Sequence, residues 1–391
     1  MPGARRARHD SADQSRAAHI EFQPDWAVSP GTLLRSEIEE RGMTQADLAT
    51  RAQLTEKHVS QVMTGTVTLT AEVALAFERS LGVRAQTLLL AEARHQAARS
   101  SQDAFERLAK HERWARKFPL GVLRANGSIT GNERGGELVD RVLRFFGVAD
   151  QVAFEEVSLA GISGFRRAQH LQVNEFATAT WLRLGELQTA RHRLPPYSSQ
   201  KLRRSVASLR PLSNRPDGEA FQAARDELAM CGVALAFVDG INESRACGAT
   251  RWVTATRPLI VLSDRYGYRD TLWFSLMHEI GHVLRHPRRR TFVNIPEDGD
   301  DSDGLEAEAN GFAADVLVPF TDRERLLALH TRAQFRAFAE DLSIDVSLVA
   351  GQYGHLVNDW AKVSQLRKKL DIVGLEHAAR AALGEVSTTP V

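Results

Sequence analysis

The residues best suited to chemistry are two histidines and a glutamate in the run His-Glu-Ile-Gly-His-Val-Leu-Arg-His, residues 278–286. The residues before this run have a helical pattern, and residues four apart on a helix share one face. His278 and His282 can therefore bind one metal ion, while Glu279 lies beside them and can reach a water on the metal. Zinc peptidases use this arrangement, so the motif predicts a metal-dependent hydrolase.

A second segment downstream supplies candidates for the third protein ligand. Residues 306–318 have helical periodicity and end before Pro319. Glu306 is the favoured ligand, because Asn310, four residues later, can then hold a ligand histidine through its second nitrogen. Glu308 is the alternative. Two histidines and one glutamate leave the fourth position of zinc open to water, as a catalytic site requires.

Two further features lie close to the motif in the sequence, His286 and an acidic segment. His286 lies one helical turn beyond His282 and precedes Pro287. We interpret it as a cation at the negative end of the helix dipole, with a metal role as the alternative. The acidic segment 296–304 joins the two metal-site helices, and its carboxylates lack the spacing of a calcium loop. We expect a solvated, mobile loop there, which could also gate the cleft.

The composition of the chain bounds its class. With 391 residues and 43% hydrophobic residues, it is long enough for two or three domains with a sizeable core. The net charge of +1 does not point to a nucleic acid or a membrane, and no apolar run approaches the roughly 18 residues of a membrane span. Cys231 and Cys247 make no disulfide scaffold, so we expect a cytoplasmic protein.

The first ordered block, residues 31–95, is predicted to be all-α. Five short helices are expected, over residues 32–41, 44–52, 55–63, 69–81 and 85–93. Apolar residues in the second and third helices are spaced to bury one side of a helix-turn-helix, whose second helix enters the major groove of DNA. Residues 1–30 are expected to be a disordered tail, because the N-terminus is rich in Arg and Ala but lacks the apolar centre of a signal peptide.

This block resembles the Xre-type helix-turn-helix, in its antitoxin-like subclass. The match lies in Thr44-Gln45, Leu48-Ala49, Val59-Ser60, Gly65, Ala74-Leu75 and Leu81-Gly82-Val83. The resemblance implies contacts with an operator DNA, in which Gln45 and Thr64 touch phosphates. Glu56, Lys57 and Gln61 would face base edges, with Ser60 nearby. We also expect a homodimer, because such domains usually read two half-sites.

The charge of the same block leaves an alternative open. Residues 31–95 contain seven Lys or Arg and eight Asp or Glu, a net charge of −1, whereas most DNA-binding domains are basic. A helical unit for dimerisation and protein contacts is the alternative. The following region, residues 96–215, is predicted to be mostly helical and carries 20 basic and 11 acidic residues. It is either a face for a nucleic acid or an acidic partner, or an ordinary solvated helix surface.

The last region, residues 216–383, is predicted to be α+β, and the chain as a whole is therefore assigned to the α+β class. A helix over residues 221–231 precedes three strands, at 233–238, 248–254 and 258–262. The two metal-site helices follow, in the layout of a small gluzincin-type peptidase. A strand beside the site could align an extended peptide by edge pairing. Residues 321–370 are expected to form helices around residues 351–354, and the tail after Leu383 is expected to be disordered.

The motifs together are similar to the ImmA/IrrE family of metallopeptidases, over about residues 221–319. The pattern Glu-x-Glu-Ala-Asn-x-Phe-Ala-Ala at residues 306–314 carries the resemblance, together with His-Glu-x-x-His. Gly-Ala-Thr-Arg-Trp at 248–252 and Leu-Trp-Phe at 272–274 resemble the subgroup fused to an N-terminal Xre domain. The resemblance implies His278, His282 and Glu306 as ligands of Zn²⁺, or of Mn²⁺, with Glu279 as the base.

Two functions are consistent with these features. The first is a DNA-binding regulatory zinc metalloendopeptidase that cleaves a repressor or antitoxin-like protein, as in a stress response. The alternative is a transcriptional regulator or antitoxin, with a cognate toxin as partner, in which the metal site senses or stabilises without proteolysis. For catalysis, a donor must stabilise the oxyanion of the transition state, and Tyr266, Tyr353 and His355 are the candidates.

Overall fold

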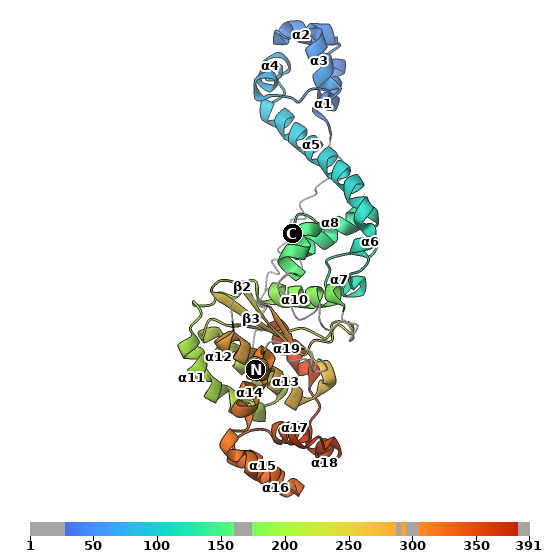
Figure 1. Ribbon diagram of the computed structural model, residues 1–391. Coiled ribbons are helices and arrows are strands. Elements are labelled where there is room, and N and C mark those ends of the chain that lie inside the picture. Colours follow the sequence, from blue (N-terminus) through green and yellow to red (C-terminus); the bar gives the residue numbers. More distant parts are fainter. Residues whose placement is uncertain (1–27, 160–173, 287–290, 295–303, 382–391) are drawn as a thin grey trace, which may run out of the picture. The chain divides into compact units, whose positions relative to one another are not determined.

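The structure is a computed structural model that describes residues 28–159, 174–286, 291–294 and 304–381. The predicted N-terminal tail up to residue 27, the acidic segment up to residue 303 and the predicted C-terminal tail lie outside the described residues. The chain divides into two compact units, Met1–Arg107 and Leu108–Val391, which are described separately (Figure 1). None of the described helices combines the length and the apolar character needed to span a membrane.

The N-terminal unit consists of helices joined by short turns. They are α1 (Pro30–Glu40), α2 (Gln45–Ala52), α3 (Glu56–Met63), α4 (Ala71–Leu81) and α5 (Ala85–Leu108). A Ser or Thr side chain caps each of the first four by accepting a backbone N–H in the first turn. Thr44 and Asp47 form a complete capping box at the start of α2. The predicted start of this helix therefore has a local physical cause.

The core of this unit contains one fully buried residue or more from each helix. Leu34, Leu48, Val59, Phe77 and Leu88 have no exposed surface. Helix α5 continues to Leu108, although the apolar pattern predicts an end at residue 93. The added residues are mostly exposed, and they contain neither glycine nor proline. The helix therefore continues on intrinsic propensity where the burial pattern has ended.

The C-terminal unit begins with a small helical layer. Its helices are α6 (Glu112–Ala115), α7 (Leu120–Ala125), α8 (Gly135–Phe146), α9 (Gln151–Phe154) and α10 (Glu175–Thr189). The ring of Phe118 lies at its centre, 5.0–5.2 Å between centroids from the rings of Trp114, Phe146, Phe154 and Phe176. Such contacts add to the energy of burial, so this layer is held by aromatic packing.

A buried glutamate fixes the turn that leads into α8. Glu133 is 3% exposed and accepts hydrogen bonds from the backbone N–H groups of Thr130 and Gly131, both at 2.7 Å. Burial by itself would raise the pKa of Glu133, but these hydrogen bonds outweigh it and lower the pKa to about 2. The carboxylate is therefore mostly ionised in the folded protein at pH values well above 2.

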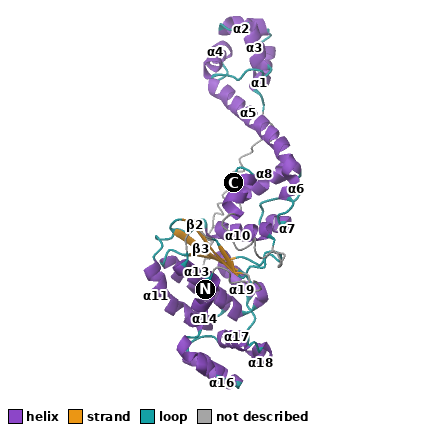
Figure 2. Cartoon of the chain, in the orientation of Figure 1, coloured by secondary structure: helices purple, strands orange, loops and turns teal. Residues whose placement is uncertain are grey.

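A four-stranded sheet, in the order β1-β3-β2-β4, forms the middle layer of the unit (Figure 2). The strands are β1 (Ala234–Phe237), β2 (Gly248–Thr254), β3 (Arg257–Leu262) and β4 (Phe292–Asn294). β1 pairs with β3 in parallel, and β2 pairs antiparallel with β3 and β4. The first three strands match the predicted spans closely. β4 was not predicted, because three residues are too few for a local pattern.

Alternate residues of the sheet pack against different helices. Leu235 and Ile260 belong to the large core with α12 (Asp217–Met230) and α13 (Arg269–Arg285), whereas Ala236 and Val261 pack with Trp181 of α10. Both faces of β1 and β3 are therefore covered, as expected for strands that are apolar throughout. This packing holds α13, which carries the His-Glu-x-x-His motif, against one face of the sheet.

The remaining helices are α11 (Ser199–Leu209), α14 (Leu305–Leu317), α15 (Arg323–Leu327), α16 (Arg332–Asp341), α17 (Val346–Val357), α18 (Trp360–Val363) and α19 (Ile372–Ala381). Of these, α11, α14 and α17 contact α13, whereas α15, α16 and α18 pack on α17 and α19 packs on α12. Residues 351–354, around which helices were expected, lie inside α17. A Cβ at Gly351 would lie 2.6 Å from Oδ2 of Asp270. The glycine therefore serves close packing of α17 on α13.

A network of buried charges holds the start of α13. Arg269 pairs with Asp217 at 2.8 Å and with Asp345 at 3.0 Å, and Arg367 pairs with Asp270 at 2.8 Å. Lys368 completes the network on Asp345. Since the three aspartates are nearly or fully buried, each needs its cation, and the network joins the first turns of three helices to a segment near the C-terminus.

Candidate metal centre

The side chains of the motif lie on the buried side of α13. His278 and His282 are each 1% exposed, and Glu279 has no exposed surface. Helix α13 is covered by the sheet on one side and by α14 and α17 on others, so the polar residues of the motif cannot be solvated by bulk water. Buried polar groups need partners, and these partners define the site.

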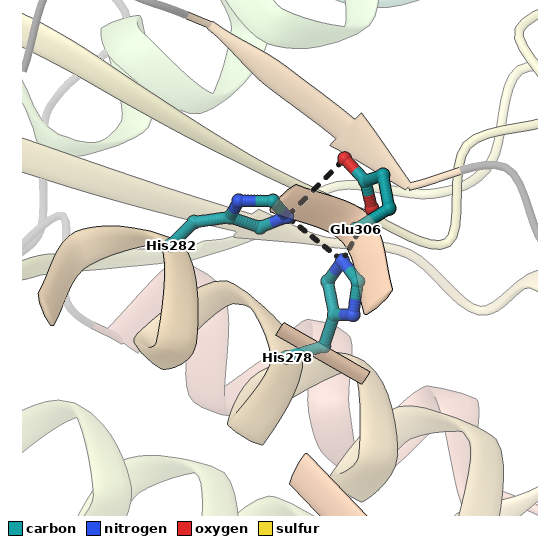
Figure 3. Close-up of side chains that lie close together, drawn as sticks. All are labelled: His278, His282 and Glu306. Carbon is teal, nitrogen blue, oxygen red and sulfur yellow. Dashed lines mark hydrogen bonds and ion pairs between the residues drawn. The ribbon is translucent and has the colours of Figure 1, made fainter. Parts of the chain in front are cut away.

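Three side chains of α13 and α14 converge, and we call His278, His282 and Glu306 the metal-ligand cluster (Figure 3). Nε2 of His278 lies 3.1 Å from Oε2 of Glu306, and Nε2 of His282 lies 3.4 Å from Oε1. The two Nε2 atoms are 2.9 Å apart. Ligand atoms on a tetrahedral zinc ion are about 3.3 Å apart, so these residues fit such an ion.

The electrostatics of the cluster follow from burial and mutual contact. Burial would raise the pKa of Glu306, but hydrogen bonds from the two histidines outweigh it and lower the pKa below its usual range. Burial also lowers the pKa of His282 to about 4, so its ring is neutral at pH 7. An ionised carboxylate beside a neutral imidazole is the form in which these groups bind a metal.

Other side chains hold the second nitrogen of each ligand histidine. Nδ1 of His278 lies 2.9 Å from Oδ1 of Asn310, the contact that the spacing of Glu306 and Asn310 predicts. Nδ1 of His282 lies 2.6 Å from Nδ1 of His286. The interpretation of His286 as a cation at the helix end is therefore incomplete, because its ring is buried against His282. Glu308 contacts His286 and Arg285, outside the metal-ligand cluster.

Glu279 is held by a residue of the sheet. Its Oε2 accepts a hydrogen bond of 2.7 Å from Oγ1 of Thr250 on β2. Its Oε1 is buried and has no hydrogen-bond partner among the described residues. Burial raises the pKa of Glu279 to about 8. A carboxyl group with a pKa near neutrality and one free oxygen can both accept and release a proton.

The sequence reasoning did not identify the two residues of β2 that surround Glu279. A Cβ at Gly248 would lie 2.8 Å from Oε1 of Glu279, so the glycine leaves the space that the carboxylate occupies. Gly248 and Thr250 are two apart on one strand and therefore face the same side of the sheet. The sequence therefore predicts that Gly248 and Thr250 share a face of the strand. Only the packing of β2 on α13 shows that this face contacts Glu279.

An aromatic ring covers the other side of the cluster. Phe292 of β4 stacks on His282, with ring centroids 4.1 Å apart and an angle of 19° between the planes. It also contacts His286 at 5.3 Å between centroids. Since β4 was not predicted from the sequence, neither was this contact. Phe292 limits the rotation of both imidazole rings.

The candidates for oxyanion stabilisation differ in their surroundings. The hydroxyl group of Tyr353 lies 2.6 Å from Nζ of Lys362, and its ring packs on Phe335 in the core. Tyr266 lies in a turn with φ of +66° and is 42% exposed, and His355 is exposed on α17. Nothing in these positions brings one of the three to the metal-ligand cluster, so the oxyanion donor stays unassigned.

The residues expected to touch DNA share one side of the helix-turn-helix. On α3, Val59, Val62 and Met63 are buried, and the opposite side carries the predicted contacts. At 100° per residue these fall within about 140° of the helix circumference. They are Glu56, Lys57, Ser60 and Gln61, followed by Thr64 at the C-cap. Gln45 is the first residue of α2, where the positive end of the helix dipole suits a phosphate contact.

Comparisons with known proteins agree with both halves of the sequence interpretation. Residues 242–349 match the model of a peptidase family described as the IrrE N-terminal-like domain. Residues 34–88 match a family model described as helix-turn-helix. No curated protein matches the chain. The predicted fusion of a helix-turn-helix to an IrrE-like domain is thus confirmed, as is the α+β class. The matches indicate a DNA-binding regulator with a metallopeptidase-like domain and a divalent metal.

Proposed function

We propose, from a chain that joins a helix-turn-helix to an IrrE-like peptidase domain, that this protein is a DNA-binding regulatory zinc metalloendopeptidase. Its substrate would be a repressor or an antitoxin-like protein. One observation carries the proposal: two buried histidines and the partly exposed Glu306 lie beside Glu279, which is fully buried and has one oxygen without a hydrogen-bond partner among the described residues. This set has the groups that metal-assisted hydrolysis requires.

Zinc held by His278, His282 and Glu306 would polarise the scissile carbonyl and make a water molecule more acidic. Glu279 would accept the proton of the attacking water through Oε1, because Thr250 occupies Oε2. Burial raises the pKa of Glu279, which favours retention of that proton until it passes to the leaving amine. Burial of the two histidines and of Glu279 restricts bulk water on their side of the site, so the charges there act with little screening.

The N-terminal unit would bring the peptidase to an operator. In this proposal Gln45 and Thr64 contact phosphates, and Glu56, Lys57, Ser60 and Gln61 lie at or near base edges. The unit would act as a homodimer on two half-sites. The local density of protein substrate on the same DNA would then raise the rate of cleavage, because tethered partners meet at a high effective concentration.

A second function is favoured by the position of the metal-ligand cluster. Its residues come from two helices, so a bound metal would also stabilise the contact between α13 and α14. A regulator or antitoxin that uses the metal to sense or to stabilise, without proteolysis, is therefore the competing proposal. The two functions differ in their dependence on Glu279, which is not among the proposed ligands.

The test is a survey of new protein N-termini in cells that express the chain or its Glu279→Gln variant. We expect N-termini that appear only with the unchanged chain, and these identify the substrate. Glu324→Gln, at an exposed carboxylate on α15, is the matched control and should give the same termini as the unchanged chain. Identical termini with and without Glu279, at rest and under stress, would contradict proteolysis and favour the non-catalytic regulator.

A further inference from the structure

We propose that His286 and Glu308 form a hydrogen-bonded relay that positions His282 for its metal. The inference rests on the proposed metal centre and deepens it, because it assigns a task to two residues outside the metal-ligand cluster. The relay runs from Nδ1 of His282 to Nδ1 of His286 at 2.6 Å, and from Nε2 of His286 to Oε2 of Glu308 at 3.3 Å. Arg285 holds the other oxygen of Glu308 at 2.9 Å.

The geometry allows one arrangement of protons for a metal-binding His282. Its Nε2 faces His278 and Glu306, so this nitrogen must offer its lone pair to the metal. The proton of the ring is then on Nδ1 and is donated to Nδ1 of His286. His286 must accept there, and its own proton lies on Nε2, where Glu308 accepts it. Each nitrogen of the relay, Nδ1 of His282 and the two ring nitrogens of His286, then has one partner, and the relay ends on the carboxylate of Glu308.

The helix places the relay residues in line. His278, His282 and His286 follow one another at intervals of four residues, so they form a stripe along α13. The backbone N–H of His286 donates to the carbonyl of His282 at 3.1 Å, which keeps His286 on the last turn of the helix. Phe292 covers both rings of the relay. His286 is 7% exposed, so bulk water is a poor substitute for its hydrogen bonds.

The two ligand histidines are thus held in different ways. Asn310 accepts directly from His278, whereas His282 reaches its carboxylate through a second imidazole. Groups that hold the second nitrogen of a ligand histidine typically contribute 10- to 100-fold to metal affinity. Because Asn310 and Glu308 both lie in the first turns of α14, that helix would orient both histidines as well as supply Glu306.

The test measures zinc affinity of the full chain by competition with a chromophoric chelator. His286→Leu removes the relay but keeps a buried apolar volume, and we expect a 10- to 100-fold weaker Kd. His286→Asn places an acceptor near the position of Nδ1, and it should recover most of the affinity. Glu308→Gln should give a smaller loss. Asp315→Asn breaks another exposed carboxylate–arginine pair on α14, at 2.8 Å, and should leave the Kd unchanged.

A second readout separates the relay from a packing role. In the zinc-bound chain, long-range ¹H–¹⁵N spectra should show His282 protonated on Nδ1 and His286 on Nε2. Equal affinities of the unchanged chain and His286→Leu, or equally weak binding by His286→Leu and His286→Asn, would overturn the relay. Failure of the unchanged chain to bind zinc at all would instead overturn the metal centre and with it the proposed function.

Discussion

Glu279 occupies a space that β2 leaves open by having no side chain at residue 248. A Cβ there would lie 2.8 Å from Oε1 and 3.0 Å from Cγ of Glu279. Either the carboxylate or the strand must move to accept it. Glu279 is not among the proposed ligands, so the proton acceptor can be displaced without loss of the metal. Residue 248 is therefore a place where chemistry and metal binding can be separated.

We predict that Gly248→Ala lowers kcat on the identified substrate by at least about tenfold, because small displacements of a catalytic group have large effects on rate. Zinc content should stay at the level of the unchanged chain. The matched control is Gly311→Ala on α14, where a Cβ would meet nothing within 4 Å. That variant should keep full activity and gain about 0.5–1 kcal/mol of stability. Loss of zinc from Gly248→Ala would refute this separation.

Thr250 provides a second test at the same carboxylate. Thr250→Val keeps the shape of the side chain but removes the 2.7 Å hydrogen bond to Oε2 of Glu279. We expect kcat to fall by about tenfold or more with little change in KM, since the carboxylate loses its fixed orientation. Thr250→Ser keeps the hydroxyl group and should retain most of kcat. Similar kcat values for the valine and serine variants would argue against a positioning role for the hydroxyl.

At the scale of elements, what could be predicted depends on how local its cause is. Helices α2 and α3 begin where Thr44 and Thr55 cap them, and the sequence predicts both within a residue. β4 could not be predicted, because its three residues form a strand only by pairing with residues 248–250 of β2. The ligand histidines were found from their spacing on one helix. Thr250 was not, since it reaches the site from a strand that lies well before the motif, and Phe292 was not, since it belongs to β4, which has no local pattern.

The turn before α8 makes a prediction about acid stability. Glu133 has a pKa of about 2 in the folded chain, against an ordinary value of 4.5. A lowered pKa contributes stability that is fully present above about pH 4.5 and is lost as the pH falls towards 2. Glu133→Gln should lower the free energy of unfolding at pH 7 by about 1–3 kcal/mol. The dependence of Tm on pH should flatten between pH 4.5 and 2.

The control for this prediction is Glu137→Gln, on the exposed side of α8. It changes the same charge a few residues away, without the two backbone hydrogen bonds of 2.7 Å that Glu133 accepts. Thermal unfolding followed by circular dichroism between pH 2 and 7 measures both variants. Parallel Tm curves for Glu133→Gln and Glu137→Gln would show that the hydrogen bonds of Glu133 do not supply the acid dependence.

At the scale of the whole molecule, the chain has two compact units with separate cores. The residues proposed to read DNA are on one unit, and the metal-ligand cluster is on the other. Changes on the exposed side of α3 should therefore act on one activity alone. This separation also allows either unit to lose its activity without unfolding of the other.

We predict that Gln61→Ala weakens binding to the selected operator by about 1–3 kcal/mol, roughly 5- to 150-fold, if Gln61 faces a base edge. Zinc affinity and cleavage of free substrate should be unchanged. Fluorescence anisotropy at a fixed salt concentration measures the DNA affinity. Arg79→Ala, which removes a charge in the last turn of α4, is the control. An equal loss with both variants would argue against base reading by α3.

The buried charges at the start of α13 also impose an order on synthesis of the chain. Asp270 and Asp345 receive Arg367 and Lys368 from a segment close to the end of the sequence. Until the ribosome has released that segment, Asp270 and Asp345 lack these two cations, and the network that holds the start of α13 is incomplete. The helix-turn-helix precedes α13 in the sequence and can fold earlier. A nascent chain would thus have a folded helix-turn-helix before it has a complete metal-ligand cluster.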